Sequence, residues 1–103
     1  MRYLIGLAAI LTLATPSAAA QFRCDNPGGA YLAVVRQAEV ILDPDTFNAR
    51  LPIIGRIDTR EIGAIVLQTA DPTVTEIFHT RPEPKMEVFS DGELAQVDFC
   101  VEL

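Results

Sequence analysis

Two cysteines, Cys24 and Cys100, are the residues of this chain best suited to covalent chemistry, and they lie near its two ends. The chain has no Cys-x-x-Cys pair, and His79 is its only histidine. A structural zinc site normally uses four Cys or His ligands at short spacings, and a redox-active thiol needs an activating environment. The sequence therefore predicts no metal site at these sulfurs. It favours one disulfide between Cys24 and Cys100, with two unpaired thiols as the alternative.

Residues that could catalyse a reaction are sparse. A histidine-based triad would have to use His79, and Ser90 is the only serine beyond residue 20. Asp43, Asp45 and Asn48 resemble the start of a calcium loop, but the glycine at the sixth position and the closing glutamate are missing. We therefore expect a protein that is not an enzyme and has no catalytic residue, no cofactor and no bound metal.

The first twenty residues have the layout of a secretory signal peptide. Arg2 precedes a short apolar run over 4–13, and Ala18-Ala19-Ala20 provides small residues before a cleavage point between Ala20 and Gln21. The run is shorter than the roughly twenty residues needed to span a bilayer. The sequence predicts a periplasmic or secreted protein of one small domain, residues 21–103. After cleavage it would have no integral membrane segment, and its cysteines could oxidise.

The charge of the predicted mature chain is acidic. Without Arg2, seven of the eight basic residues remain against fourteen acidic ones, which gives a net charge of about -7. Such a surface repels nucleic acid and anionic lipid and suits a cationic partner. We expect a protein partner and no nucleic acid.

The clearest predicted element is a hairpin at the C-terminus. Asp91-Gly92 between two strand-like runs, 85–90 and 93–103, is a strong signal for a two-residue turn. The turn predicts that Phe89 faces Leu94, that Val88 faces Ala95, and so on to Lys85 and Asp98. In the last strand, residues alternate between an apolar face and a more polar face. Because Cys100 lies on the polar face, the disulfide is expected on the outer side of the sheet.

The remaining elements are also read as strands. Residues 30–42 favour two short strands bent at Arg36-Gln37, with a helix as the alternative. The stretch 43–50 fits one helical turn that Pro52 ends, and 79–84 fits a stiff, exposed connection. Together with strands at 62–67 and 74–80, this predicts an all-β fold. We expect a small antiparallel barrel or sandwich of five to seven short strands closed by one disulfide. The alternative is an α+β fold in which 30–42 is helical.

Three residues are candidates for contact with a partner: Phe89 and Leu94, which the hairpin places opposite each other, and Arg81 in the proline-rich connection. An exposed apolar pair marks an interface unless a second layer of the fold covers it. We therefore expect an exported binding or accessory protein without catalytic activity.

The two ends of the chain resemble those of the periplasmic C-type lysozyme inhibitors. The resemblance rests on Phe22-Arg23-Cys24-Asp25, on Cys100 in the last strand, and on the stretch 88–93. It covers about twenty residues and implies a small β-barrel that plugs a cationic lysozyme. The Ser-Gly-x-x-Tyr loop that carries inhibition in that family has no counterpart here, so no functional residue is transferred. The alternative function is therefore an inhibitor or immunity-type protein that blocks a cationic enzyme such as a lysozyme.

Overall fold

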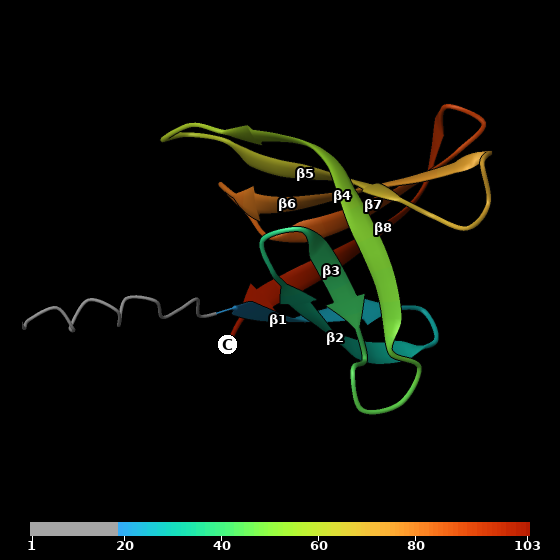
Figure 1. Cartoon of the computed structure of the whole chain (residues 1–103), viewed down its shortest axis with the longest axis horizontal. Coiled ribbons are helices and arrows are strands. Elements are labelled where there is room, and N and C mark those ends of the chain that lie inside the picture. The colour runs from blue at the N-terminus through green and yellow to red at the C-terminus, as the bar shows by residue number, and fades with distance from the viewer. Residues whose placement is uncertain (1–18) are drawn as a thin grey trace, which may run out of the picture.

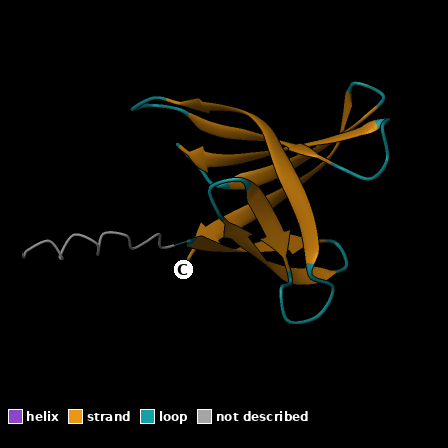
Figure 2. Ribbon diagram, viewed as in Figure 1, coloured by secondary structure: helices purple, strands orange, loops and turns teal. Residues whose placement is uncertain are grey.

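Residues 19–103 are described by a computed structural model, and they form eight antiparallel strands (Figures 1 and 2). The strands are β1 (Ala20–Asn26), β2 (Gly29–Val35), β3 (Glu39–Leu42), β4 (Ala49–Asp58), β5 (Gly63–Gln68), β6 (Val74–Arg81), β7 (Lys85–Ser90) and β8 (Glu93–Glu102). The all-β prediction is confirmed, and the number of strands exceeds the predicted five to seven. The predicted signal peptide lies outside the described residues except for Ala19 and Ala20.

The strands follow one another around a closed barrel in chain order, and β1 pairs with β8 to complete it. Closure removes the unpaired edges that an open sheet would expose. Since each hairpin reverses direction, the β1–β2, β3–β4, β5–β6 and β7–β8 loops lie at one end of the barrel. We call this end the mouth. No helix among the described residues is long and apolar enough to cross a membrane.

Strand β4 joins the two halves of the barrel. Its first part, Ala49–Pro52, pairs with β3, and the part from Ile53 onward pairs with β5, with an irregularity between Ile53 and Gly55. The prediction that Pro52 ends an element is wrong. Pro52 lies within β4, at the last position paired with β3, where the missing N–H is tolerated because the strand changes partner there.

The C-terminal hairpin forms as predicted at its turn and shifts by one residue beyond it. Asp91 and Gly92 have φ values of 52° and 82°, as a two-residue hairpin turn requires. Phe89 pairs with Leu94 as predicted, but a bulge then makes Val88 pair with Gln96 instead of Ala95. The predicted register from Val88 to Lys85 is therefore wrong, because one extra residue on β8 is not paired.

This shift inverts the two faces of β8. Asp98 and Cys100 point into the barrel and are buried, whereas Phe99 and Val101 are more than half exposed on the outside. The apolar face of the strand is thus the outer face, and the polar face lines the interior.

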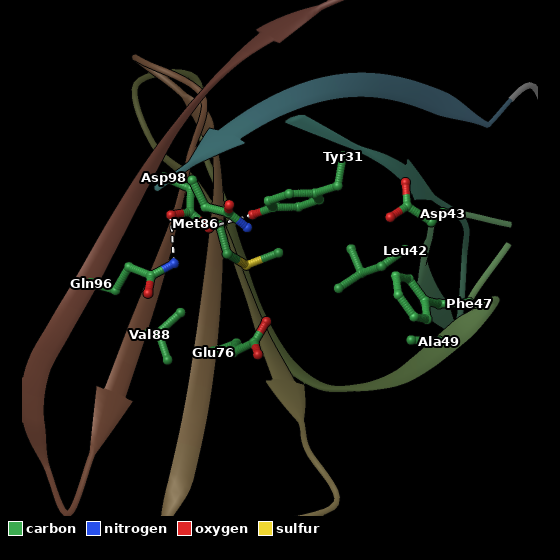
Figure 3. Close-up of a pocket in the computed structure, with 11 residues that line it drawn as sticks. Tyr31, Leu42, Asp43, Phe47, Ala49, Glu76, Met86, Val88, Gln96 and Asp98 are labelled. Carbon is green, nitrogen blue, oxygen red and sulfur yellow. Dashed lines mark hydrogen bonds between the residues drawn. The ribbon is translucent and has the colours of Figure 1, made fainter. Parts of the chain in front are cut away.

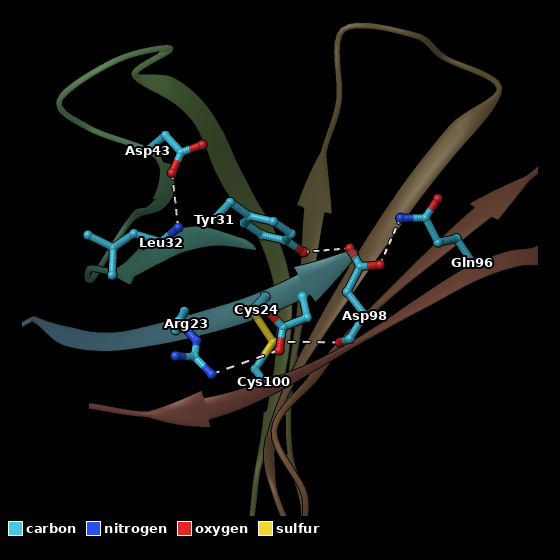
Figure 4. Close-up of a disulfide and its surroundings, with 9 residues drawn as sticks. Arg23, Cys24, Tyr31, Leu32, Asp43, Gln96, Asp98 and Cys100 are labelled. Carbon is cyan, nitrogen blue, oxygen red and sulfur yellow. Dashed lines mark hydrogen bonds and ion pairs between the residues drawn. A yellow bond between two sulfur atoms is a disulfide. The ribbon is translucent and has the colours of Figure 1, made fainter. Parts of the chain in front are cut away.

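The disulfide between Cys24 and Cys100 forms as predicted, but inside the barrel rather than outside it (Figure 4). The two cysteines are direct partners across the β1–β8 seam, with their Cα atoms 4.0 Å apart. Cys24 is completely buried. The prediction of an outer bridge was wrong because it took the polar face of β8 as the solvent face.

The core fills the middle of the barrel. Phe78 on β6 is fully buried and meets Phe22 on β1 edge to face, with ring centroids 4.9 Å apart. The buried cluster around them consists of Cys24, Ala33, Val40, Ile65, Leu67, Met86 and Cys100. An eight-stranded barrel is narrow enough for side chains to fill its interior.

Three further predictions are settled by the strand bounds and the turn geometry. Residues 30–42 form strands β2 and β3 with a bend at 36–38, so the helical alternative is excluded. The predicted helical turn over 43–50 is wrong: 43–48 is a turn and 49–50 begin β4. Asp43 adopts a positive φ of 47°, and its carbonyl accepts hydrogen bonds from the N–H groups of Thr46 and Asn48. His79 belongs to β6, not to the following connection.

Candidate functional site

A cavity of about 310 Å³ opens at the mouth of the barrel (Figure 3). Seven of the eight strands, all but β5, and the β3–β4 loop contribute to its walls. The lining residues are Asn26, Tyr31, Leu42, Asp43, Phe47, Ala49, Glu76, Met86, Val88, Gln96 and Asp98. Apolar walls with a few convergent polar groups are typical of a site for a small ligand or a single side chain.

A hydrogen-bonded trio forms one side of the cavity. The Tyr31 hydroxyl donates to Oδ2 of Asp98 at 2.7 Å, and Nε2 of Gln96 donates to Oδ1 of the same carboxylate at 2.7 Å (Figures 3 and 4). Burial, followed by the bond to Asp98, raises the pKa of the Tyr31 phenol far above its usual range. The phenol therefore stays protonated, and both oxygens of the buried Asp98 carboxylate have a donor.

The Tyr31–Asp98 bond connects β2 to β8 across the inner face of β1. On β1, Cys24 is the direct partner of Tyr31, and on β8, Cys100 lies two residues beyond Asp98. The disulfide thus lies directly beside the trio. It fixes β1, which carries Cys24, relative to β8, which carries Asp98. The position of the polar wall depends on this seam.

Glu76 carries the third carboxylate that lines the cavity, beside those of Asp98 and Asp43. It points into the cavity from β6 (Figure 3), where its neighbours across the strands are Leu67 and Val88. Among residues 19–103 no hydrogen bond to its side chain is found. Burial, followed by the negative charge of Asp98, raises the pKa of the Glu76 carboxyl above its ordinary value of 4.5.

The opposite wall comes from the β3–β4 loop. Leu42, Phe47 and Ala49 face the β6–β8 wall across the open space (Figure 3). Phe47 is 84% exposed although it is a large apolar residue. Two sets of hydrogen bonds hold the loop that carries this ring. The Asp43 carbonyl accepts from the turn, and the Asp43 carboxylate accepts from the Leu32 N–H at 3.0 Å.

Removing the charge of Glu76 is expected to stabilise the protein. A carboxyl with a raised pKa in the folded state favours folding when protonated, so its ionised form weakens the fold as pH rises above 4.5. We expect Glu76→Gln to raise the free energy of unfolding at pH 7 by less than about 1 kcal/mol, since solvent screens the partly exposed group. Urea unfolding of both proteins between pH 4 and pH 8 measures this.

The difference between wild type and Glu76→Gln should shrink toward pH 4, where the wild-type carboxyl is protonated in both states. Glu83→Gln is the matched control, because Glu83 is exposed in the β6–β7 turn at the other end of the barrel. A wild type that is more stable than Glu76→Gln at pH 7 would contradict the prediction.

The sequence-predicted contact residues lie on the outside of the barrel. Phe89 and Leu94 are brought together as a cross-strand pair near the β7–β8 turn, where Leu94 is 52% exposed. Arg81 lies at the opposite end of β6, so it is not brought near this pair. Its guanidinium binds the Asp58 carboxylate and the carbonyl of Thr59, which ties β6 to the β4–β5 loop.

The remaining chemical candidates have contacts within the chain. Nε2 of His79 lies 2.6 Å from Oε1 of Glu87 on the outer face of the sheet, and His79 does not line the mouth. Asp43 of the calcium-like stretch lines the mouth, with its carboxylate bound to the Leu32 N–H. Among the described residues, no group of three or more His, Cys, Asp or Glu side chains is arranged to hold a metal ion.

Sequence reasoning missed the residues that distinguish the cavity, chiefly Tyr31, Phe47, Glu76 and Asp98. One signal was present: Asp98 shares a face of the last strand with Cys100. Since cysteines are among the most buried residue types, that face could have been placed inside, with its polar residues. Comparison with known proteins adds no relative: no family model, no curated protein and no solved structure matches this chain.

Proposed function

We propose that this chain is a small exported binding protein without catalytic activity and that its binding site is the mouth of the barrel. The observation that supports the proposal is the cavity of about 310 Å³ with an exposed aromatic ring, Phe47, at its rim. At 84% exposure, the Phe47 ring is largely uncovered by the rest of residues 19–103. It gains contacts when a ligand, or a side chain of a protein partner, enters the mouth.

Tyr31 gives a direct test of occupancy. The chain has two tyrosines and no tryptophan, and after removal of the predicted signal peptide Tyr31 is the only tyrosine left. We expect 1-hexanol or hexylammonium to change the Tyr31 fluorescence in a saturable way, because either chain can lie against the apolar walls. Titration of the oxidised protein measures the dissociation constant.

Phe47→Ala should weaken this binding severalfold, since a phenyl ring that covers a ligand contributes on the order of 1 kcal/mol. Ile57→Ala is the control, because Ile57 is also exposed but lies at the far end of β4, outside the lining. If no probe gives a saturable signal, or if both variants weaken binding equally, the mouth is not the binding site.

One observation favours the alternative function, an inhibitor of a cationic enzyme. Three acidic residues, Asp43, Glu76 and Asp98, line the mouth, and none of the lining residues is basic. This arrangement suits a basic side chain that protrudes from an enzyme. The alternative predicts that excess protein stops lysozyme from clearing cell walls, and unchanged clearing rejects lysozyme as the target.

A further inference from the structure

We propose that the ligand of the barrel mouth is an organic cation, an ammonium or guanidinium group on an apolar body, with its charge at Glu76 and its body against Phe47. This inference rests on the proposed function, which places the binding site at the mouth. It adds the chemical class of the ligand.

The first argument concerns which carboxylate is free to pair with a cation. Asp98 accepts from Tyr31 and from Gln96, so its oxygens are already committed. Asp43 uses one oxygen, Oδ1, to accept a hydrogen bond from the Leu32 N–H of β2. Glu76 has no such donor within residues 19–103. A protonated amine or a guanidinium supplies N–H donors and a positive charge, and it would pair with this carboxylate in a partly desolvated site.

The second argument concerns the walls around that carboxylate. Met86 and Val88 lie on the same side as Glu76, and Leu42 and Phe47 lie across the opening (Figure 3). A fully hydrated inorganic cation would gain nothing from these side chains. An organic cation gains from burying its carbon atoms against them, Phe47 included, while its charged group lies at Glu76.

The third argument is the cost of Glu76 to the fold. The Glu76 carboxylate, which has no donor among residues 19–103, has Leu67 and Val88 as strand neighbours, and burial and the charge of Asp98 disfavour its ionised form. A residue that weakens the folded state and points into a cavity fits a role in binding better than a role in stability. A bound cation would offset this cost by supplying the missing charge.

The test compares three probes that share one alkyl body: hexylammonium, 1-hexanol and hexanoate. We expect hexylammonium to bind roughly tenfold more tightly than 1-hexanol, as one charge-assisted hydrogen bond provides, and hexanoate to bind most weakly. Tyr31 fluorescence of the oxidised protein at pH 7 and low salt is the measurement. Glu76→Gln should abolish the preference for hexylammonium over 1-hexanol, and Glu83→Gln should retain it.

The outcomes separate this inference from the proposed function. If 1-hexanol binds as tightly as hexylammonium, the mouth binds ligands but the cationic class is wrong. If Glu76→Gln keeps the full preference for hexylammonium, the ammonium group does not bind at Glu76. If none of the probes binds, the proposed function itself fails. Glu76→Gln is expected to be folded, so loss of preference cannot be attributed to unfolding, and its urea midpoint verifies this.

The same cation could belong to a free amine or to a lysine side chain of a protein. N-acetyl-lysine amide, tested beside hexylammonium, distinguishes the two sources. Tighter binding of the lysine derivative assigns the mouth to a protein partner, and tighter binding of hexylammonium assigns it to a small molecule. Both results support the cationic class, and failure of both amines to bind more tightly than 1-hexanol overturns it.

Discussion

Replacing both Cys24 and Cys100 with alanine is expected to lower the free energy of unfolding by about 4 kcal/mol. The reason is that the bridge closes a loop of 76 positions and so limits the entropy of the unfolded chain. Stabilities of small domains are on the order of 5–15 kcal/mol, so this loss is a large share of the total. The buried position of both residues adds a cavity to the lost cross-link. We expect the double variant to be only marginally folded at 37 °C. Urea unfolding followed by far-UV circular dichroism measures the difference.

The effect should extend to the mouth, because the disulfide adjoins the trio of Tyr31, Gln96 and Asp98. Tyr31 fluorescence should shift in the double variant before global unfolding. Adding a reducing agent is the control: it should destabilise the wild type and leave the double variant unchanged. Equal urea midpoints for the two proteins would show that the seam between β1 and β8 does not depend on the bridge.

The second large effect is expected for Phe78. Phe78→Ala should cost about 3–5 kcal/mol, because the ring is fully buried at the centre of the barrel and packs on Phe22. Phe99→Ala should change stability by less than about 0.5 kcal/mol, since Phe99 is 57% exposed on the outer face of β8. Chemical denaturation of both variants under one set of conditions gives the comparison.

This pair of variants tests which face of β8 is inside. The sequence pattern alone would place Phe99 in the core with Val97 and Val101, so Phe99→Ala would then be as costly as Phe78→Ala. A large loss of stability for Phe99→Ala would therefore contradict the position of Phe99 on the outer face of β8. Phe78→Leu, which keeps most of the volume, should recover the greater part of the loss.

Local chemistry made part of the fold predictable. The Asp91-Gly92 turn, the alternation in the last strand and the bend at 36–37 each follow from residue types within a few positions, and each corresponds to a feature of the barrel. The pairing of Cys24 with Cys100 also followed, because only two cysteines are present.

The register of β8 and the identity of its buried face depended on a single residue without a strand partner, Ala95. The bulge at Ala95 does not interrupt the alternation of the sequence, yet it changes every partner of β8 beyond Leu94 and decides which face is buried. The mouth could not be predicted from spacing either, because Tyr31, Phe47, Glu76 and Asp98 are brought together only when all eight strands are in register. Non-local pairing, not local preference, builds the candidate site.

The pairing of β1 with β8 also affects the order in which the molecule can be completed. Strand β1 has its second partner in β8, seven strands later along the chain, so a chain that lacks β8 cannot close and carries two open sheet edges. Completion of the cylinder must wait until β8 is available to pair with β1. Deleting β8 should therefore leave a chain prone to aggregate rather than a smaller version of the same protein.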